Sequence, residues 1–270
     1  MARFKLALLQ LPVSPNADLN RKRAEEWLKR AAKRGAQMAV LPEMFTCPYD
    51  TALFASYAES VDGQTVHMLQ EVARVEGMVI VGGSFPEQAA DGKVYNSCPV
   101  IDADGRLLAV HRKLHMFDIY VDGGQHFCES DAVVPGSEIT VVSTKCCEVG
   151  VAVCYDIRFP ELALSMAEKG AKLLVYPASF NPTTGPLHWE LLFRARAMDC
   201  QAFTVGVASA AGQECGYTSY GHSIVCDPWG KVLLQMNEEE GLSVIEICLD
   251  EADRVRRQLP FLAHRRKEIY

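Results

Sequence analysis

Short apolar runs alternate with longer amphipathic segments along almost the whole chain. The apolar runs predict β-strands at residues 5–11, 38–41, 78–84, 94–101, 107–111, 139–142, 149–153, 173–176, 202–208, 223–226, 232–234 and 243–247. Amphipathic periodicity predicts helices at residues 18–34, 64–76, 160–169, 187–201 and 250–257. Asp104-Gly105 and Trp229-Gly230 each separate two strands, which is typical of hairpin turns. The pattern predicts an α/β fold with mixed sheets.

Two segments of the chain resemble each other. Residues 35–43 (GAQMAVLPE) and 170–178 (GAKLLVYPA) each follow a predicted helix and each contain an apolar strand that ends in proline. Two related halves packed face to face would explain this repeat. The copies differ after the proline, where Glu43 stands in one and Ala178 in the other. A carboxylate at the end of a buried strand is unfavourable unless it is paired or used, which favours a functional role for Glu43, although a solvent-exposed strand end would make it ordinary.

Composition and charge narrow the classes of protein to consider. The chain has 270 residues, of which 49% are hydrophobic and 23% charged, so we expect one globular domain over residues 1–270. Its net charge of −7 argues against nucleic acid and anionic membranes as partners. No stretch approaches the ~20 apolar residues of a membrane span. Ten cysteines without repeated spacing are unlike a secreted disulfide framework, so we expect a cytoplasmic protein.

A carboxylate, an ammonium group and a thiol follow three of the predicted strands, at Glu43, Lys113 and Cys154. A thiol that attacks an amide needs a base, a stabiliser for the oxyanion and a proton for the departing ammonia. Glu43 could act as the base and return the proton to the departing ammonia, and Lys113 could stabilise the oxyanion. Cys154 precedes a helix expected to begin near Pro160, whose unpaired N–H groups would favour a thiolate. Glu129 is a candidate for activating the water that completes hydrolysis.

Other interpretations of these residues remain open. A cysteine taken alone most often packs as a small hydrophobe, and a single lysine or glutamate is usually a solvent-facing charge. His111 and His115 are four apart, but they follow a strand and lack a His-Glu-x-x-His pattern, so no metal and no other cofactor is expected. A non-catalytic binding protein on the same fold is a further alternative, although none of the three strand-end residues is missing. A thiol redox sensor that uses Cys146, Cys147 or Cys154 is also conceivable.

Three motifs resemble the Glu–Lys–Cys motifs of the nitrilase, or carbon–nitrogen hydrolase, superfamily: LPEMF at 41–45, HRKLH at 111–115 and CYDIRFPE at 154–161. The resemblance runs nearly end to end, with further matches in GPLHWE at 185–190, YGHS at 220–223 and DPWG at 227–230. It implies a four-layer α-β-β-α sandwich with two mixed sheets, paired into a homodimer or higher homo-oligomer. It also implies the roles of four residues: Cys154 as nucleophile, Glu43 as general base, Lys113 as oxyanion stabiliser and Glu129 as auxiliary carboxylate.

Two further segments indicate a branch of this superfamily. LHMFDI at 114–119 and SFNPTTGP at 179–186 look more like the omega-amidase branch than the deaminated-glutathione amidase branch. The implied substrates are water and short monoamides of dicarboxylic acids, such as α-ketoglutaramate and succinamate, which react through a thioester without a cofactor. Deaminated-glutathione amidase and N-carbamoyl amidohydrolase remain alternatives, because the same three catalytic residues serve several acyl groups.

Side chains near these motifs are expected to form the substrate pocket. The wall is expected to contain Tyr49, Phe117, Tyr155 and Thr184, although aromatic side chains are more often ordinary packing. Arg158 matches the position where related carbamoylases hold a substrate carboxylate. An ion pair between Arg158 and either Glu161 or Asp156 is the structural alternative.

Overall fold

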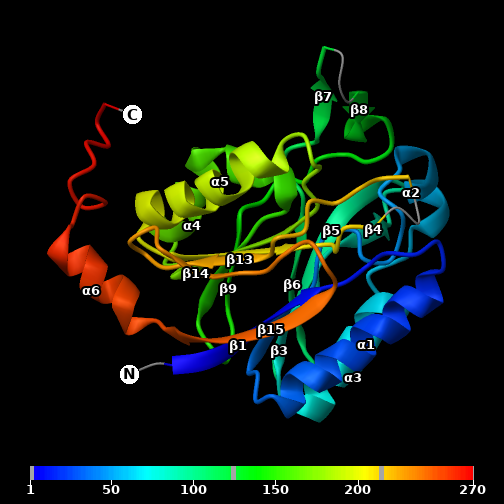
Figure 1. The fold of residues 1–270 in the computed structure, drawn as a ribbon, viewed down its shortest axis with the longest axis horizontal. Coiled ribbons are helices and arrows are strands. Elements are labelled where there is room, and N and C mark those ends of the chain that lie inside the picture. Colours follow the sequence, from blue (N-terminus) through cyan, green and yellow to red (C-terminus); the bar gives the residue numbers. More distant parts are fainter. Residues whose placement is uncertain (1–2, 123–125, 213–215, 270) are drawn as a thin grey trace.

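Two β-sheets lie face to face and helices cover the outer face of each (Figure 1). The computed structural model describes residues 3–122, 126–212 and 216–269. Helices α1 (Ala17–Lys33) and α3 (Gln64–Glu76) lie on one outer face, and helices α4 (Pro160–Glu168) and α5 (Gly185–Cys200) lie on the other. The predicted four-layer α-β-β-α sandwich is therefore confirmed.

The first sheet has the strand order β15-β1-β2-β3-β5-β4, with β6 paired to β5. Strands β1, β2 and β3 are parallel to one another, and the remaining pairings are antiparallel, so the sheet is mixed. The strand bounds are β1 (Arg3–Gln10), β2 (Met38–Val40), β3 (Val79–Val81), β4 (Phe85–Gln88), β5 (Val94–Ile101), β6 (Leu107–Arg112) and β15 (Gly241–Cys248).

The second sheet has the strand order β14-β13-β12-β11-β10-β9. Strands β10, β11 and β12 are parallel, and the outer pairings are antiparallel. The bounds are β9 (Thr140–Ser143), β10 (Glu148–Val151), β11 (Leu173–Ala178), β12 (Phe203–Ala208), β13 (Ile224–Cys226) and β14 (Val232–Gln235). The two similar segments form β2 and β11, and each is the middle strand of a parallel triplet. The repeat in the sequence thus corresponds to the centres of the two facing sheets.

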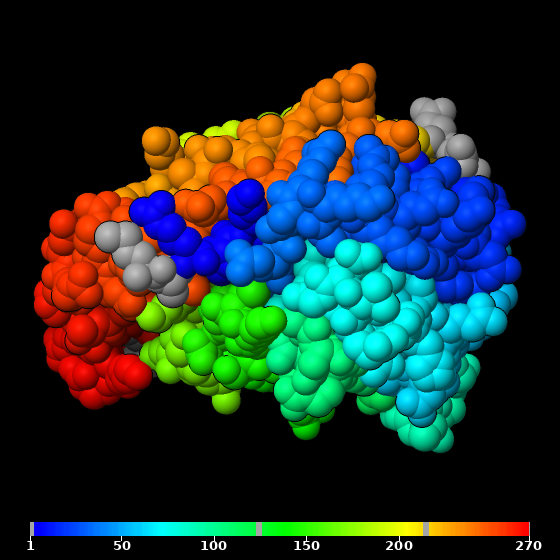
Figure 2. All heavy atoms as spheres, turned by 90° about the horizontal axis from the view of Figure 1, so that it is seen from below, coloured from blue at the N-terminus to red at the C-terminus, as the bar shows by residue number. Residues whose placement is uncertain are grey.

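The main hydrophobic core lies between the sheets. It combines side chains of the first sheet, such as Leu6 and Val40, with Val151 and Val175 of the second, all fully buried. The other face of the first sheet is covered by α1 and α3, which lie side by side on the surface (Figure 2). Because the central strands are covered on both faces, they read as continuous apolar runs rather than as alternating ones.

Every strand and helix predicted from the pattern overlaps an observed element, but short elements were missed. Among them are β4, helix α2 (Thr51–Tyr57), and the hairpin of β7 (Asp118–Tyr120) and β8 (His126–Cys128), which projects from the body of the molecule (Figure 1). Helix α2 buries only Phe54, and the hairpin is largely exposed, so neither carries a clear periodicity. Helix α6 (Asp250–Gln258) follows β15 as predicted. Within the described ranges, no helix has the length and apolar character needed to cross a membrane.

Candidate active site

The three strand-end residues come from both sheets. Glu43 follows β2 and Lys113 follows β6 in the first sheet, whereas Cys154 follows β10 in the second. Cys154 adopts the left-handed conformation with φ 48°, which is uncommon for a side chain other than glycine and marks a sharp turn. A 3₁₀-helix (Cys154–Arg158) fills the space before α4 begins at the predicted Pro160. The N–H groups nearest the thiol therefore belong to a 3₁₀ turn and not to the α-helix.

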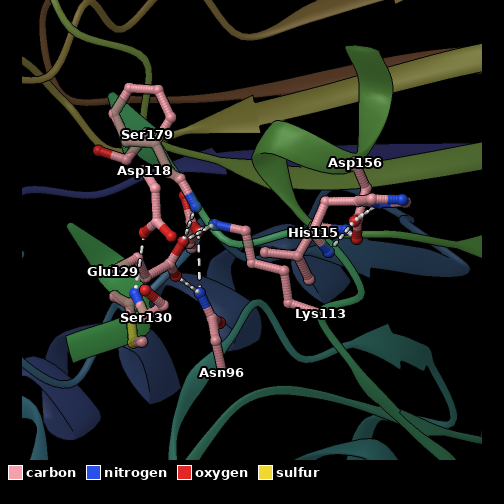
Figure 3. Close-up of polar contacts among 12 residues, drawn as sticks. Asn96, Lys113, His115, Asp118, Glu129, Ser130, Asp156 and Ser179 are labelled. Atoms are coloured by element: carbon pink, nitrogen blue, oxygen red, sulfur yellow. Dashed lines mark hydrogen bonds and ion pairs between the residues drawn. The ribbon is translucent and has the colours of Figure 1, made fainter. Parts of the chain in front are cut away.

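Lys113 lies between two carboxylates. Its Nζ donates to Glu43 Oε1 at 3.0 Å and to Glu129 Oε2 at 2.7 Å, and the side chains of all three residues are fully buried. Asn96 Nδ2 also donates to both carboxylates, to Glu43 Oε1 at 2.9 Å and to Glu129 Oε1 at 3.1 Å (Figure 3). The structure thus brings together three of the predicted catalytic residues. Asn96 was missed, although an asparagine inside the buried apolar strand β5 was a usable signal.

The two carboxylates differ in how many of their oxygens accept hydrogen bonds. Glu129 uses both oxygens, because Oε2 also accepts from the backbone N–H of Phe117 at 2.7 Å. Glu43 Oε1 accepts from Lys113, from Asn96 and, at 3.4 Å, from the Tyr49 hydroxyl. No N–H or O–H donor among the described residues reaches the buried Glu43 Oε2. Glu43 therefore keeps one oxygen for another proton donor.

The site controls which groups carry charge. Burial raises the pKa of Cys154 well above its ordinary value, and the negative charge of Glu43 adds to this rise. Burial and the charge of Glu43 therefore oppose the thiolate that the sequence predicted, whereas the charge of Lys113 favours it. Burial also raises the pKa of Glu43, against the charge of Lys113. Burial alone would lower the pKa of Lys113, but Glu129 and Glu43 raise it well above its ordinary value and keep the ammonium charged.

Cys154 lines a small cavity. Its wall contains four of the five predicted pocket residues, Phe117, Tyr155, Arg158 and Thr184, together with Ser179 and Phe180. Tyr49 instead lines a second cavity beside Glu43, and Ser179 belongs to both walls. Ser179 and Phe180 were not predicted as pocket residues, although they lie in the segment SFNPTTGP at 179–186, which indicated the branch of the superfamily.

Arg158 has an unusual set of neighbours. Its Nη1 lies 3.2 Å from His188 Nδ1, and its guanidinium lies 5.6 Å from the ring centre of Tyr155 and 5.1 Å from that of Phe180. Among the residues that the structure describes, no carboxylate forms an ion pair with Arg158. The alternative of an ion pair with Glu161 or Asp156 is therefore not realised, and the cation faces the cavity without an anionic partner.

Asp156 ties the turn at Cys154 to the segment after Lys113. It accepts hydrogen bonds from the backbone N–H groups of Val153 and His115, both at 2.9 Å, and from His115 Nδ1 at 2.8 Å (Figure 3). Burial would raise the pKa of Asp156, but hydrogen bonds from His111 and His115 lower it. Both histidines considered as metal ligands, His111 and His115, thus contact one carboxylate. No group of three possible metal ligands occurs in the described part of the chain.

A known protein family matches most of the chain. The family described as carbon-nitrogen hydrolase matches residues 5–257, and the chain therefore belongs to this family. Among curated proteins, it is 46% identical to "Omega-amidase NIT2-A" of Xenopus laevis over 270 residues, which cover 100% of this chain and 98% of the relative.

Solved structures show the same fold. Saccharomyces cerevisiae Nit3, described as a member of branch 10 of the nitrilase superfamily, has a TM-score of 0.89 and 37% sequence identity, covering 96% of this chain and 95% of its own. A mutant of the amidase from Nesterenkonia sp. AN1 has a TM-score of 0.82 and 26% identity, covering 98% of this chain and 95% of its own. That mutant shows covalent addition of the acetamide moiety of fluoroacetamide at its active site cysteine.

Proposed function

We propose that the chain is an omega-amidase, which hydrolyses the terminal amide of short dicarboxylic acid monoamides through a thioester on Cys154. The observation that carries this proposal is the cavity that joins a nucleophile to an unpaired cation. Cys154 lies on its wall, and Arg158 lies on the same wall without a carboxylate partner among the described residues. A substrate with an amide at one end and a carboxylate at the other complements both groups. The omega-amidase relative of Xenopus laevis supports the same activity.

The first half of the reaction forms the thioester. Glu43 takes the proton of the Cys154 thiol as sulfur attacks the amide carbon, and the carbonyl electron pair moves to oxygen. The ammonium of Lys113 and the backbone N–H of Tyr155 hold that oxyanion. When the oxyanion collapses, the C–N bond breaks and Glu43 returns its proton to the nitrogen, which leaves as ammonia.

The second half consumes water. Glu43, again a carboxylate, takes a proton from water as the oxygen attacks the thioester carbon, and Lys113 again holds the oxyanion. Collapse breaks the C–S bond, and the proton on Glu43 returns to sulfur, so the products are the dicarboxylic acid and the free thiol. Glu129 positions the ammonium of Lys113 throughout, since both of its oxygens are engaged.

The raised pKa values of Cys154 and Glu43 agree with their roles as nucleophile and general base. Burial and the charge of Glu43 raise the pKa of Cys154, so a neighbouring base is needed to take the thiol proton as the C–S bond forms. A carboxylate with a raised pKa, as at Glu43, is a stronger base than an ordinary glutamate and accepts that proton more readily. Proton transfer and nucleophilic attack are therefore coupled.

The assembly of the protein is also part of the proposal. The outer face of α5 exposes apolar side chains at Leu187, Leu191 and Met198, which are 71%, 64% and 48% exposed. A homodimer that pairs α5 with α5 of a second copy would bury this stripe.

Since both sheets share one core, we treat residues 1–270 as one domain. Every cysteine in the described ranges is a free thiol, which supports a reducing cytoplasm.

The proposal is tested by ammonia release from α-ketoglutaramate, succinamate and deaminated glutathione. We expect the wild type to favour the two short monoamides in the presence of reductant, with or without a chelator. Cys154→Ala should abolish turnover and retain the wild-type circular dichroism spectrum. A preference for deaminated glutathione would move the chain to that amidase branch. Absence of turnover on all three would contradict the omega-amidase assignment and direct the search to carbamoyl substrates and non-catalytic roles.

A further inference from the structure

The contact between Arg158 and His188 defines the protonation state of the His188 imidazole. A guanidinium offers only N–H donors, so His188 Nδ1, 3.2 Å from Arg158 Nη1, must accept the hydrogen bond. Acceptance at Nδ1 requires a neutral ring whose proton lies on Nε2. Burial and the positive charge of Arg158 both lower the pKa of His188, which favours the same neutral form.

A neutral acceptor has a different effect on Arg158 from that of a carboxylate. A carboxylate at this place would form a bidentate ion pair and cancel the charge that faces the cavity. The imidazole orients the guanidinium and leaves its charge uncompensated. Arg158 Nε is also buried without a partner among the described residues, so this cation retains donor capacity for a ligand.

We propose that His188 is a specificity-determining residue, which holds Arg158 as an unpaired cation for the distal carboxylate of the substrate. This inference rests on the proposed function and adds to it the requirement that residue 188 be an uncharged acceptor. The site would then select acyl groups that end in a carboxylate over uncharged groups of the same size.

The position of His188 also allows a purely structural role. It lies in the first turn of α5, where its backbone N–H donates to Thr184 O at 2.9 Å. If the side chain only filled space at this turn, replacing it with asparagine or with aspartate would alter all substrates alike. The preference for one substrate over another separates the two roles.

The test compares succinamate with succinamide, which has nearly the same size but no charge. In His188→Asn and His188→Asp, an oxygen on Cγ can take the place of Nδ1, neutral in the first variant and charged in the second. Thr183→Asp adds the same charge at a neighbouring exposed position and is the matched control. The quantity measured is the ratio of kcat/KM for succinamate to that for succinamide, which does not depend on the fraction of folded enzyme.

We expect His188→Asp to lower this ratio by about 10-fold or more, the scale of a hydrogen bond to a charged group. His188→Asn and Thr183→Asp should stay within about 3-fold of the wild-type ratio, since neither cancels the charge of Arg158. An unchanged ratio in His188→Asp, or an equal loss in His188→Asn, overturns the role of His188. A wild type that does not prefer succinamate would instead overturn the proposed recognition of a carboxylate by Arg158.

Discussion

The buried charges around Lys113 explain why a carboxylate can stand at the end of a buried strand. Glu43 is 1% exposed and Glu129 and Lys113 are 0% exposed, so an isolated charge at any of them would be strongly unfavourable. The ammonium of Lys113 lies between the two carboxylates and stabilises both charges, while burial raises the pKa of Glu43. The sequence posed pairing and use as alternatives for Glu43. The structure pairs it with Lys113, and the proposed mechanism uses it as the base.

The raised pKa of Glu43 predicts the pH dependence of the reaction. Glu43 must be ionised to act as a base, so activity is retained above its pKa and lost as the pH falls through it. We expect the acidic limb of kcat/KM to lie above 4.5, the ordinary value for a glutamate, because burial raises the pKa. A pH profile with an uncharged amide substrate measures this limb without titrating the substrate. A limb at or below 4.5 would contradict the assignment of Glu43 as the base.

Replacing Glu43 with glutamine tests the same base in another way. Glu43→Gln preserves the shape of the side chain but removes the proton acceptor, so kcat/KM should fall by about 10²–10⁴-fold. Acylation should be the blocked step. Rapid quenching followed by mass spectrometry of the intact protein should therefore detect no thioester on Cys154 before steady state. Fast accumulation of the thioester in this variant would exclude Glu43 as the first base.

At the scale of elements, the site depends on how the ends of β6 and β10 are joined. These strands belong to different sheets, so no backbone ladder fixes one end relative to the other. Asp156 makes the connection through the N–H groups of His115, two residues after Lys113, and of Val153, one residue before Cys154. It therefore helps to set the separation between ammonium and thiol.

Asp156→Asn should weaken both stability and catalysis. An asparagine presents an NH₂ group to N–H donors, so at least one buried hydrogen bond is lost and the free energy of unfolding should fall by about 2–4 kcal/mol. The effect on turnover should fall mainly on kcat, because the substrate cavity is not lined by Asp156. Urea unfolding and steady-state kinetics at neutral pH measure the two effects. Wild-type stability together with wild-type kcat would exclude the connecting role.

The lowered pKa of Asp156 fixes the pH at which this stabilisation disappears. The unfolded chain has an ordinary aspartate pKa of about 3.9, so the stabilisation is fully present above that value. It is lost as the pH falls towards the lowered pKa of the folded state. The stability difference between wild type and Asp156→Asn should thus shrink as the pH falls below about 4.

At the scale of the whole molecule, the apolar face of α5 governs assembly in the proposed dimer. Leu191→Arg places a charge in the centre of that face and should convert the homodimer into a monomer, since burying an unpaired charge is unfavourable. Sedimentation velocity measures the change in mass. Val75→Arg on α3, where the side chain is 59% exposed on the opposite side of the sandwich, is the control and should leave the dimer intact. A monomeric wild type would contradict the proposed interface.

Local sequence patterns predicted the main strands and helices, because buried strands and amphipathic helices repeat over a few neighbouring residues. They also placed Glu43, Lys113 and Cys154 after strands, as the structure does. They did not reveal α2 or the β7–β8 hairpin, whose exposed residues carry no such repeat. Only the folded chain shows the partners of Asn96, the hydrogen bonds by which Asp156 connects two segments, and the absence of a carboxylate beside Arg158 among the described residues. The raised pKa of Cys154 arose there too. Each of these depends on burial or charge contributed by residues distant in the chain, and local patterns do not encode such distances.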